Sequence, residues 1–263
     1  MRSRYLALLG SIFLSVVVLV GLTVNGRAAA EPAAEILGGP TLPTTTRASV
    51  NIDNEEGNGD STIPAISANG RFVAFASQAT NLDPLFDDNG FQDIFLKDLQ
   101  TNVITRVVGF SQTGSPNGDS KNPDISADGR YVVFETLADD LTNGEPGDFN
   151  GASDVFLYDR NNPSSQLHLI SMSDFNFTAG NGPSYLPSIS ANGRRIAFVS
   201  EATNLNRDDP DAIADIFVYD DATFELRLVS RATDGIKGNG PSTNPSISAD
   251  GRYVAFESTA TNL

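Results

Sequence analysis

The chain has 263 residues with a formal net charge of −16 at pH 7, and it contains no cysteine. This length suits one large domain, and the missing cysteines exclude disulfides and thiolate metal sites. Nucleic acid is excluded as a partner because it repels a strongly acidic protein.

Residues 1–30 have the pattern of a secretory signal peptide: basic residues at the start, an apolar run over 5–24, and Ala28, Ala29 and Ala30 at the end. About 20 apolar residues can also span a bilayer as an uncleaved N-terminal anchor. Both alternatives predict an extracytoplasmic protein, periplasmic or secreted, with no other membrane contact. Residues 31–44, rich in Ala, Pro and Thr, are expected to be a flexible spacer.

Residues 45–263 contain a repeat. The pattern Pro-x-Ile-Ser-Ala-[Asp/Asn]-Gly-Arg begins at Pro64, Pro123, Pro187 and Pro245, with 58 to 64 residues between successive copies. A second pattern, Asp-[Ile/Val]-Phe, recurs at Asp93, Asp154 and Asp215. Residues 180–205 and 238–263 are identical at 19 of 26 positions. Such regular self-similarity is typical of a fold built by stacking one unit.

Each unit predicts four short antiparallel strands, a to d. Strand a ends at the Ile-Ser pair, and the following Asn-Gly or Asp-Gly predicts a type I′ hairpin turn into strand b. Strand c begins at the Asp-[Ile/Val]-Phe pattern, and strand d follows another turn. Three or more such units indicate an all-β protein, a β-propeller of four-stranded blades. The predicted blades cover residues 62–112, 121–174 and 185–234, with a partial unit over 243–263.

Residues 45–52 resemble a strand d, so we expect them to form the outer strand of a neighbouring or closing blade. Three complete blades are few for this architecture. Two alternatives remain: a truncated copy of a larger propeller, or a four-bladed ring in which one blade has three strands.

The Pro-x-Ile-Ser-Ala-[Asp/Asn]-Gly-Arg-[Tyr/Phe]-Val-[Ala/Val]-Phe pattern resembles the repeat of TolB-like periplasmic proteins, and its sequel Ala-Thr-Asn-Leu is similar to exported bacterial members of that group. The third unit departs from it at Arg195-Ile196. The resemblance implies a β-propeller that serves as an interaction platform.

The loops between strands b and c share the acidic pattern Asp-x-[Asn/Asp]-[Gly/Ala]-x-x-Asp in one register. Carboxylate and amide oxygens at positions 1, 3 and 7 are ligands that Ca²⁺ prefers. The alternative is turn chemistry, because Asp, Asn and Gly are ordinary turn formers. The predicted calcium ligands are Asp87, Asn89, Asp93, Asp148, Asn150, Asp154, Asp209, Asp211 and Asp215.

These loops and the connections from strand d to the next strand a are expected on one face, which we name the long-loop face. Long loops on a rigid scaffold are where binding usually occurs. The sequence therefore predicts a non-catalytic scaffold that binds a protein or glycan there, with Ca²⁺ as the candidate cofactor. No catalytic motif is present, and His168 has no histidine counterpart in other units. The alternative is the propeller part of an extracytoplasmic carbohydrate-active or peptidase-linked enzyme.

Overall fold

The computed structural model describes residues 17–19, 45–83, 89–107, 115–141, 150–162 and 167–263, and these contain strands but no helix. Three four-stranded antiparallel sheets form three blades. The first comprises β3 (Ser61–Ile66), β4 (Phe72–Ser77), β5 (Asp93–Asp98) and β6 (Ile104–Arg106). The second comprises β7 (Ser120–Ile125), β8 (Tyr131–Thr136), β9 (Asp154–Asp159) and β10 (Leu167–Leu169). The third comprises β11 (Ser184–Ile189), β12 (Arg195–Ser200), β13 (Asp215–Asp220) and β14 (Glu225–Leu228).

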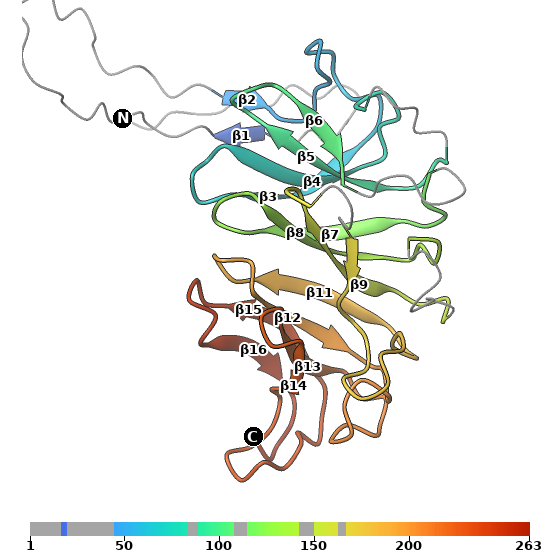
Figure 1. The fold of residues 1–263 in the computed structure, drawn as a ribbon, viewed down its shortest axis with the longest axis vertical. Helices are drawn as coiled ribbons and strands as arrows, with labels where there is room; N and C mark the ends of the chain where they lie inside the picture. Colours follow the sequence, from blue (N-terminus) through green and yellow to red (C-terminus); the bar gives the residue numbers. More distant parts are fainter. Residues whose placement is uncertain (1–16, 20–44, 84–88, 108–114, 142–149, 163–166) are drawn as a thin grey trace, which may run out of the picture.

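A two-stranded unit follows the third blade, made of β15 (Ser242–Ile247) and β16 (Val254–Ser258). Figure 1 shows the blades following one another in chain order, with the first blade and the β15–β16 unit at opposite ends of a fan. The inner strands β3, β7, β11 and β15 are successive neighbours. The predicted all-β propeller of three complete blades and a partial unit is therefore confirmed.

The core lies between the blades because the central strands are buried on both faces, as β4 is throughout its length. One apolar cluster joins the first blade to the second, and another joins the second to the third. Within each blade two phenylalanines from strands b and c stack, for example Phe75 on Phe95 with ring centroids 5.9 Å apart. Strands apolar on both faces are the expected result when sheets stack on either side.

The predicted type I′ turn between strands a and b is wrong. Gly70 has φ +69°, but Asn69 is not left-handed, so only one of the two central residues has positive φ. The amide of Gly70 donates to the Ser67 carbonyl oxygen at 2.8 Å. The Ser67 hydroxyl donates to Asn69 Oδ1 and accepts from the amide of Phe72. This side-chain network fixes the turn, and it gives the repeated serine a structural role.

The same hairpin glycine forms the contact between blades. An added Cβ on Gly129, where φ is +72°, would lie 2.1 Å from the ring of Phe72 in the preceding blade. Gly193 stands in the same relation to Tyr131, also at 2.1 Å. In the first two blades the aromatic residue after the Gly-Arg pair thus packs on the next hairpin. Glycine is required there for both backbone conformation and space.

The inner strands share a further feature, a bulge at the third residue. Ile63, Asn122, Leu186 and Asn244 all have φ between 50° and 53°, and the pairing register shifts at each of these positions. A bulge bends its strand and leaves a backbone group without its ladder partner. The Leu186 amide instead donates to Glu135 Oε2 in the preceding blade, at 2.7 Å.

Near the N-terminus β1 (Val17–Leu19) pairs antiparallel with β2 (Thr45–Arg47). The rest of the predicted signal peptide and all of the predicted spacer, residues 31–44, lie outside the described residues. Among the described residues, no helix is long and apolar enough to cross a membrane. Just after β2, Ala48 is fully buried against the first blade, where it packs with Val73 and Phe95.

Candidate cation site on the long-loop face

The acidic loops lie directly beside the strand d to strand a connections, which together form the long-loop face. In the first blade the Asn89 amide donates to the Pro116 carbonyl oxygen at 2.7 Å. In the second blade Asn150 donates to the Gly180 carbonyl oxygen, also at 2.7 Å. In the third blade Asp211 contacts Lys237 of the following connection at 2.9 Å.

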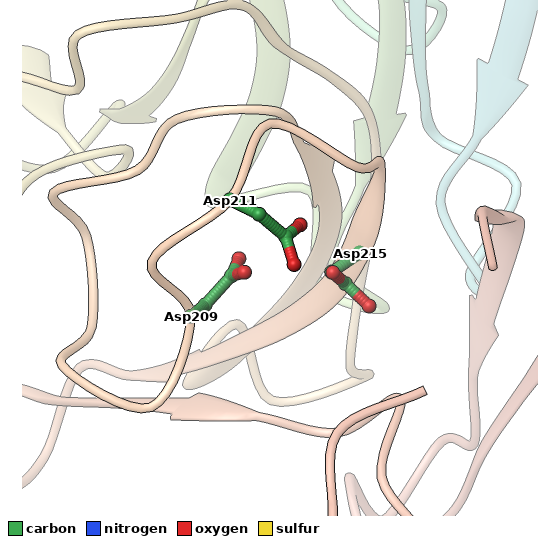
Figure 2. A group of neighbouring side chains, drawn as sticks. All are labelled: Asp209, Asp211 and Asp215. Atoms are coloured by element: carbon green, nitrogen blue, oxygen red, sulfur yellow. The ribbon is translucent and has the colours of Figure 1, made fainter. Parts of the chain in front are cut away.

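The third loop brings its three predicted ligands together. Asp209, Asp211 and Asp215 each offer a carboxylate oxygen, and these oxygens lie within 4.8 Å of one another. Figure 2 shows the three side chains turned toward a common space, with Asp209 and Asp211 on the loop and Asp215 at the start of β13. Oxygens on opposite sides of one Ca²⁺ would lie about 5 Å apart, given its bond lengths of about 2.4 Å. The donor set therefore fits a hard cation.

Burial makes this cluster electrostatically costly. Asp209 and Asp215 are fully buried, whereas Asp211 is partly exposed. Neither carboxylate oxygen of Asp209 accepts a hydrogen bond. Burial raises the pKa of Asp209 to about 6, although the nearby Lys237 ammonium opposes that shift. Buried carboxylates normally have donors or a cation to compensate lost hydration.

One cationic side chain reaches all three carboxylates. The Lys237 Nζ atom lies 2.7 Å from Asp215 Oδ2, 2.9 Å from Asp211 Oδ1 and 3.3 Å from Asp209 Oδ1. Burial alone would lower the pKa of Lys237, but the hydrogen bonds to Asp215 and Asp211 raise it. A single ammonium against three carboxylates leaves a formal charge of −2 when all are ionised. The cluster can thus accept further positive charge.

A serine anchors the last aspartate in two blades. The Ser230 hydroxyl donates to Asp215 Oδ1 at 2.6 Å and accepts from the amide of Ile216. Ser171 makes the same two contacts, donating to Asp154 Oδ1 and accepting from the amide of Val155. This side-chain bridge holds the carboxylate at the start of strand c, so that the aspartate position is set before any cation binds.

The first and second loops differ from the third in what meets their aspartate. Asp93 Oδ2 contacts Arg106 Nη1 at 3.4 Å, and both side chains are buried. In the second loop the Asn150 amide donates to Asp154 Oδ2 at 2.8 Å. Asn89 Oδ1 accepts from the amide of Phe91, an ordinary turn contact. The remaining predicted ligands, Asp87 and Asp148, lie outside the described residues.

Sequence reasoning missed the two cations that meet these aspartates. Arg106 pairs with Phe95 across the sheet, and the residues in that position of the other blades are Leu169 and Leu228. A charged residue where other repeats are apolar was the available signal. Lys237 precedes a Gly-Asn-Gly segment, where the corresponding residues are Glu56 and Ala179.

Comparison with known proteins finds no matching family model and no matching curated protein. Among solved structures, TolB from Acinetobacter baumannii is similar with 19% identity and a TM-score of 0.43, over 82% of this chain and 46% of that one. A TolB-like protein of Agrobacterium tumefaciens has 16% identity and a TM-score of 0.44, over 84% and 65%. The β-propeller domain of the Trilobed protease from Pyrococcus furiosus has 13% identity and a TM-score of 0.39, over 66% and 45%.

The chain thus spans about half to two thirds of the length of the two TolB structures. Its propeller architecture rests on its own three stacked four-stranded sheets.

Proposed function

We propose that this protein is an extracytoplasmic, non-catalytic propeller scaffold whose long-loop face binds a protein or glycan, and that the third loop of this face binds Ca²⁺. One observation carries the metal part of the proposal: the fully buried carboxylate of Asp209, met by the Lys237 ammonium at 3.3 Å, points into a cluster with Asp211 and Asp215. A divalent cation would supply the compensation that one lysine gives only in part.

The chemistry of the site favours Ca²⁺ over softer metals because its donors are all carboxylate oxygens. In this arrangement Asp215 is fixed by Ser230, Asp209 closes the buried side, and partly exposed Asp211 meets the solvent side. Bound Ca²⁺ would displace the Lys237 ammonium from the centre. Water would complete the six to eight oxygens that Ca²⁺ takes.

A binding role for the long-loop face is supported by its position on a rigid sheet stack. The connections are pinned to the loops after strand b: Asn181 donates to the Thr203 hydroxyl at 2.9 Å, and Asn239 donates to Thr261 at 3.0 Å. A face held this firmly can present charged groups to a partner with little loss of conformational freedom. Among the described residues, none specifically supports the enzyme alternative.

The metal proposal is tested by thermal unfolding of the protein in the presence of Ca²⁺ and of a chelator. Ligand that binds only the folded form at one hundred times its Kd adds about 2.7 kcal/mol. For a protein of this size that corresponds to roughly 5–10 °C in Tm. The Asp209→Asn variant should lose the Ca²⁺-dependent increase.

Asp53→Asn is the matched control, because Asp53 is an exposed aspartate in a turn away from the cluster. It should keep the full response to Ca²⁺. An unchanged Tm for the parent protein at millimolar Ca²⁺ would refute the metal site. The scaffold role is tested separately, by screening glycans and cross-linked proteins for a partner lost when charges on the long-loop face are reversed.

A further inference from the structure

The first and third blades have the same backbone where the segment that leads into the blade meets the turn from strand c to strand d. Asn102 and Phe224 hold the same place in that turn, with φ +61° and +58°. Asn54 and Phe177 hold the same place in the leading segment, with φ +63° and +55°. The side chains that the two blades put at this place can therefore be compared directly.

In the first blade a buried ammonium group fills the place. Lys97 is 1% exposed, and its Nζ atom donates to the carbonyl oxygens of Val50 at 3.0 Å and Asn102 at 2.9 Å. The Asn102 amide donates to Asn54 Oδ1 at 3.1 Å. The first blade thus closes this place with a cation of its own and with polar side chains.

In the third blade the corresponding side chains are aromatic. Phe177 and Phe224 replace the two asparagines, and Tyr219 replaces the lysine. With Met172 and Asp174 they line a pocket of about 100 Å³, which we call the rim pocket. This volume is about three times the share of one water molecule in the liquid, so the pocket suits one small group. The two phenylalanines are 66% and 69% exposed.

The rim pocket lies between two blades that the structure describes. Residues 172–177 and 219–226 supply its walls. Tyr219 and Leu226 also belong to the apolar cluster that joins the second blade to the third. The pocket shares no residue with the cluster of Asp209, Asp211 and Asp215. It is therefore a second, separate candidate site.

The backbone makes phenylalanine an unfavourable choice at both places. Asparagine tolerates the left-handed conformation, whereas bulky side chains rarely adopt it. In the segment after the third blade, Gly235 holds the place of Phe177, with φ +87°. Two exposed aromatic rings thus stand where other copies have asparagine or glycine. Residues held in such conformations cluster at functional sites, so the rings are candidates for contact with a ligand.

The surroundings of the rim pocket are negatively charged. Asp174 lies on its wall, and its Oδ2 atom accepts from Asn206 Nδ2 at 3.0 Å. Burial, together with the nearby carboxylates of Asp221 and Asp220, raises the pKa of Tyr219 to about 12. The phenol is therefore neutral at physiological pH and lies among carboxylates. This environment favours a cation over an anion.

Aromatic faces attract cations, and cages of aromatic rings bind quaternary ammonium groups in particular. A ring beside the pocket already has such a contact, because Arg207 Cζ lies 5.0 Å from the centroid of Phe175. The primary ammonium of Lys97 uses its N–H groups on carbonyl oxygens in the first blade. Ring faces in the third blade instead suit a methylated ammonium, which has no N–H group to satisfy.

From these observations we propose that the rim pocket binds a free quaternary ammonium compound, with the methylated nitrogen between Phe177, Phe224 and Tyr219 and with Asp174 as the counter-charge. A phosphocholine head group fits less well, because its phosphate would meet the surrounding carboxylates and a chain of net charge −16. The proposal depends neither on the calcium site nor on the scaffold role.

Calorimetric titration of the full chain with choline tests the proposal. The titration is made in chelator and at physiological ionic strength, which screens attraction to exposed charges. Choline should bind with a Kd of about 1 mM. Its neutral analogue, in which a tert-butyl group replaces the trimethylammonium group, should bind about tenfold more weakly because it lacks the attraction between cation and ring. Phosphocholine should also bind more weakly than choline.

Variants separate the walls of the pocket from its charge. Phe224→Asn and Phe177→Asn introduce the residues of the first blade, so each removes one wall and relieves the backbone. Each should weaken choline binding about tenfold without lowering Tm. Asp174→Asn should weaken choline binding about threefold and leave the neutral analogue unaffected. Tyr253→Asn, the matched control, removes a ring that is 66% exposed outside the pocket and should bind choline like the parent.

Four results would overturn the proposal. The first is an absence of saturable choline binding. The second is equal affinity for choline and its neutral analogue, which would make the pocket merely apolar. The third is unchanged choline binding in both phenylalanine variants, which would place the ligand elsewhere. The fourth is tighter binding of phosphocholine than of choline, which would replace the free compound with a head group.

Discussion

The first and third blades have the same strand order and sequence register, yet they differ at three places. The first loop meets its aspartate with Arg106, a buried residue of β6, whereas the third meets three aspartates with Lys237 from a connection. Gly70 lies in open space, whereas Gly193 lies under Tyr131. Arg71 donates through two nitrogens to Asp98, whereas the corresponding Asp220 of the third blade accepts from Nε of Arg195 at 2.8 Å.

This comparison shows that blades with the same backbone can surround equivalent aspartates with different charged side chains. The guanidinium of Arg106 belongs to a strand and is enclosed, so it acts as a permanent counter-ion. The ammonium of Lys237 belongs to a connection, and under the proposed function it would withdraw when Ca²⁺ binds. Among the described loops, the third is therefore the one that we propose to exchange its cation for a metal.

The largest expected difference concerns the hairpin glycines. Gly193→Ala should destabilise the fold by about 3 kcal/mol or more, because overpacking against Tyr131 adds to the left-handed strain. Gly70→Ala should cost about 1 kcal/mol, since only the strain applies. Urea unfolding of both variants measures the contrast. Equal losses would contradict a close contact at the blade junction.

The next effect separates the permanent counter-ion from the exchangeable one. Asp93→Asn should cost about 2 kcal/mol, because the buried Arg106 loses its charged partner. Asp211→Asn should cost much less, as Asp211 is half exposed and Lys237 keeps Asp215 and Asp209. Unfolding in chelator gives both values. A larger loss of stability for Asp211→Asn than for Asp93→Asn would contradict the assignment of Arg106 as the permanent counter-ion.

Replacing Lys237 should raise the affinity of the third loop for Ca²⁺ above that of the parent protein. Lys237→Met leaves three carboxylates without their ammonium, so the protein should be less stable in chelator and bind Ca²⁺ about tenfold more tightly, a change of about 1.4 kcal/mol. Calorimetric titration with Ca²⁺ measures the affinity. Lys121→Met, which removes an exposed lysine elsewhere, is the control and should bind like the parent.

The smallest effect is a dependence of stability on pH. The hydrogen bond from Arg71 lowers the pKa of Asp98 well below its ordinary value. A depressed folded-state pKa adds stability above the unfolded pKa of about 4, and this is lost as pH falls toward the folded value. Because Arg71 is partly exposed, the contribution should be about 1 kcal/mol. Urea unfolding from pH 7 to 3 should show a shallower acid loss in Asp98→Asn; an unchanged slope would rule this out.

The fold was predictable because each unit repeats both its apolar pattern and its turn residues. The Ile-Ser and Asp-[Ile/Val]-Phe segments correspond to strand a and strand c, as β7 and β9 illustrate. The turn type was wrong, since the Ser67 hydroxyl holds Asn69 in a conformation that a two-residue pattern does not reveal. Side-chain hydrogen bonds of this kind compete with backbone preference.

The candidate site was predictable only in part. The register of Asp209, Asp211 and Asp215 follows from one loop, so their convergence could be anticipated. The position of Lys237 could not, because it depends on how a connection 22 residues beyond Asp215 folds back on the loop. Long-range packing, rather than local pattern, decides which repeated acidic loop retains an excess of negative charge.

The nearest-neighbour character of the blade junctions has an evolutionary consequence. Because Gly129 and Gly193 each meet one ring from the preceding blade, an in-frame tandem duplication of the second unit would recreate the contacts that it interrupts. Residues 57–82 and residues 180–205 are each identical to residues 238–263 at 19 of 26 positions. Related chains could therefore gain or lose whole repeat units, whereas selection would remove substitutions of Gly129 and Gly193.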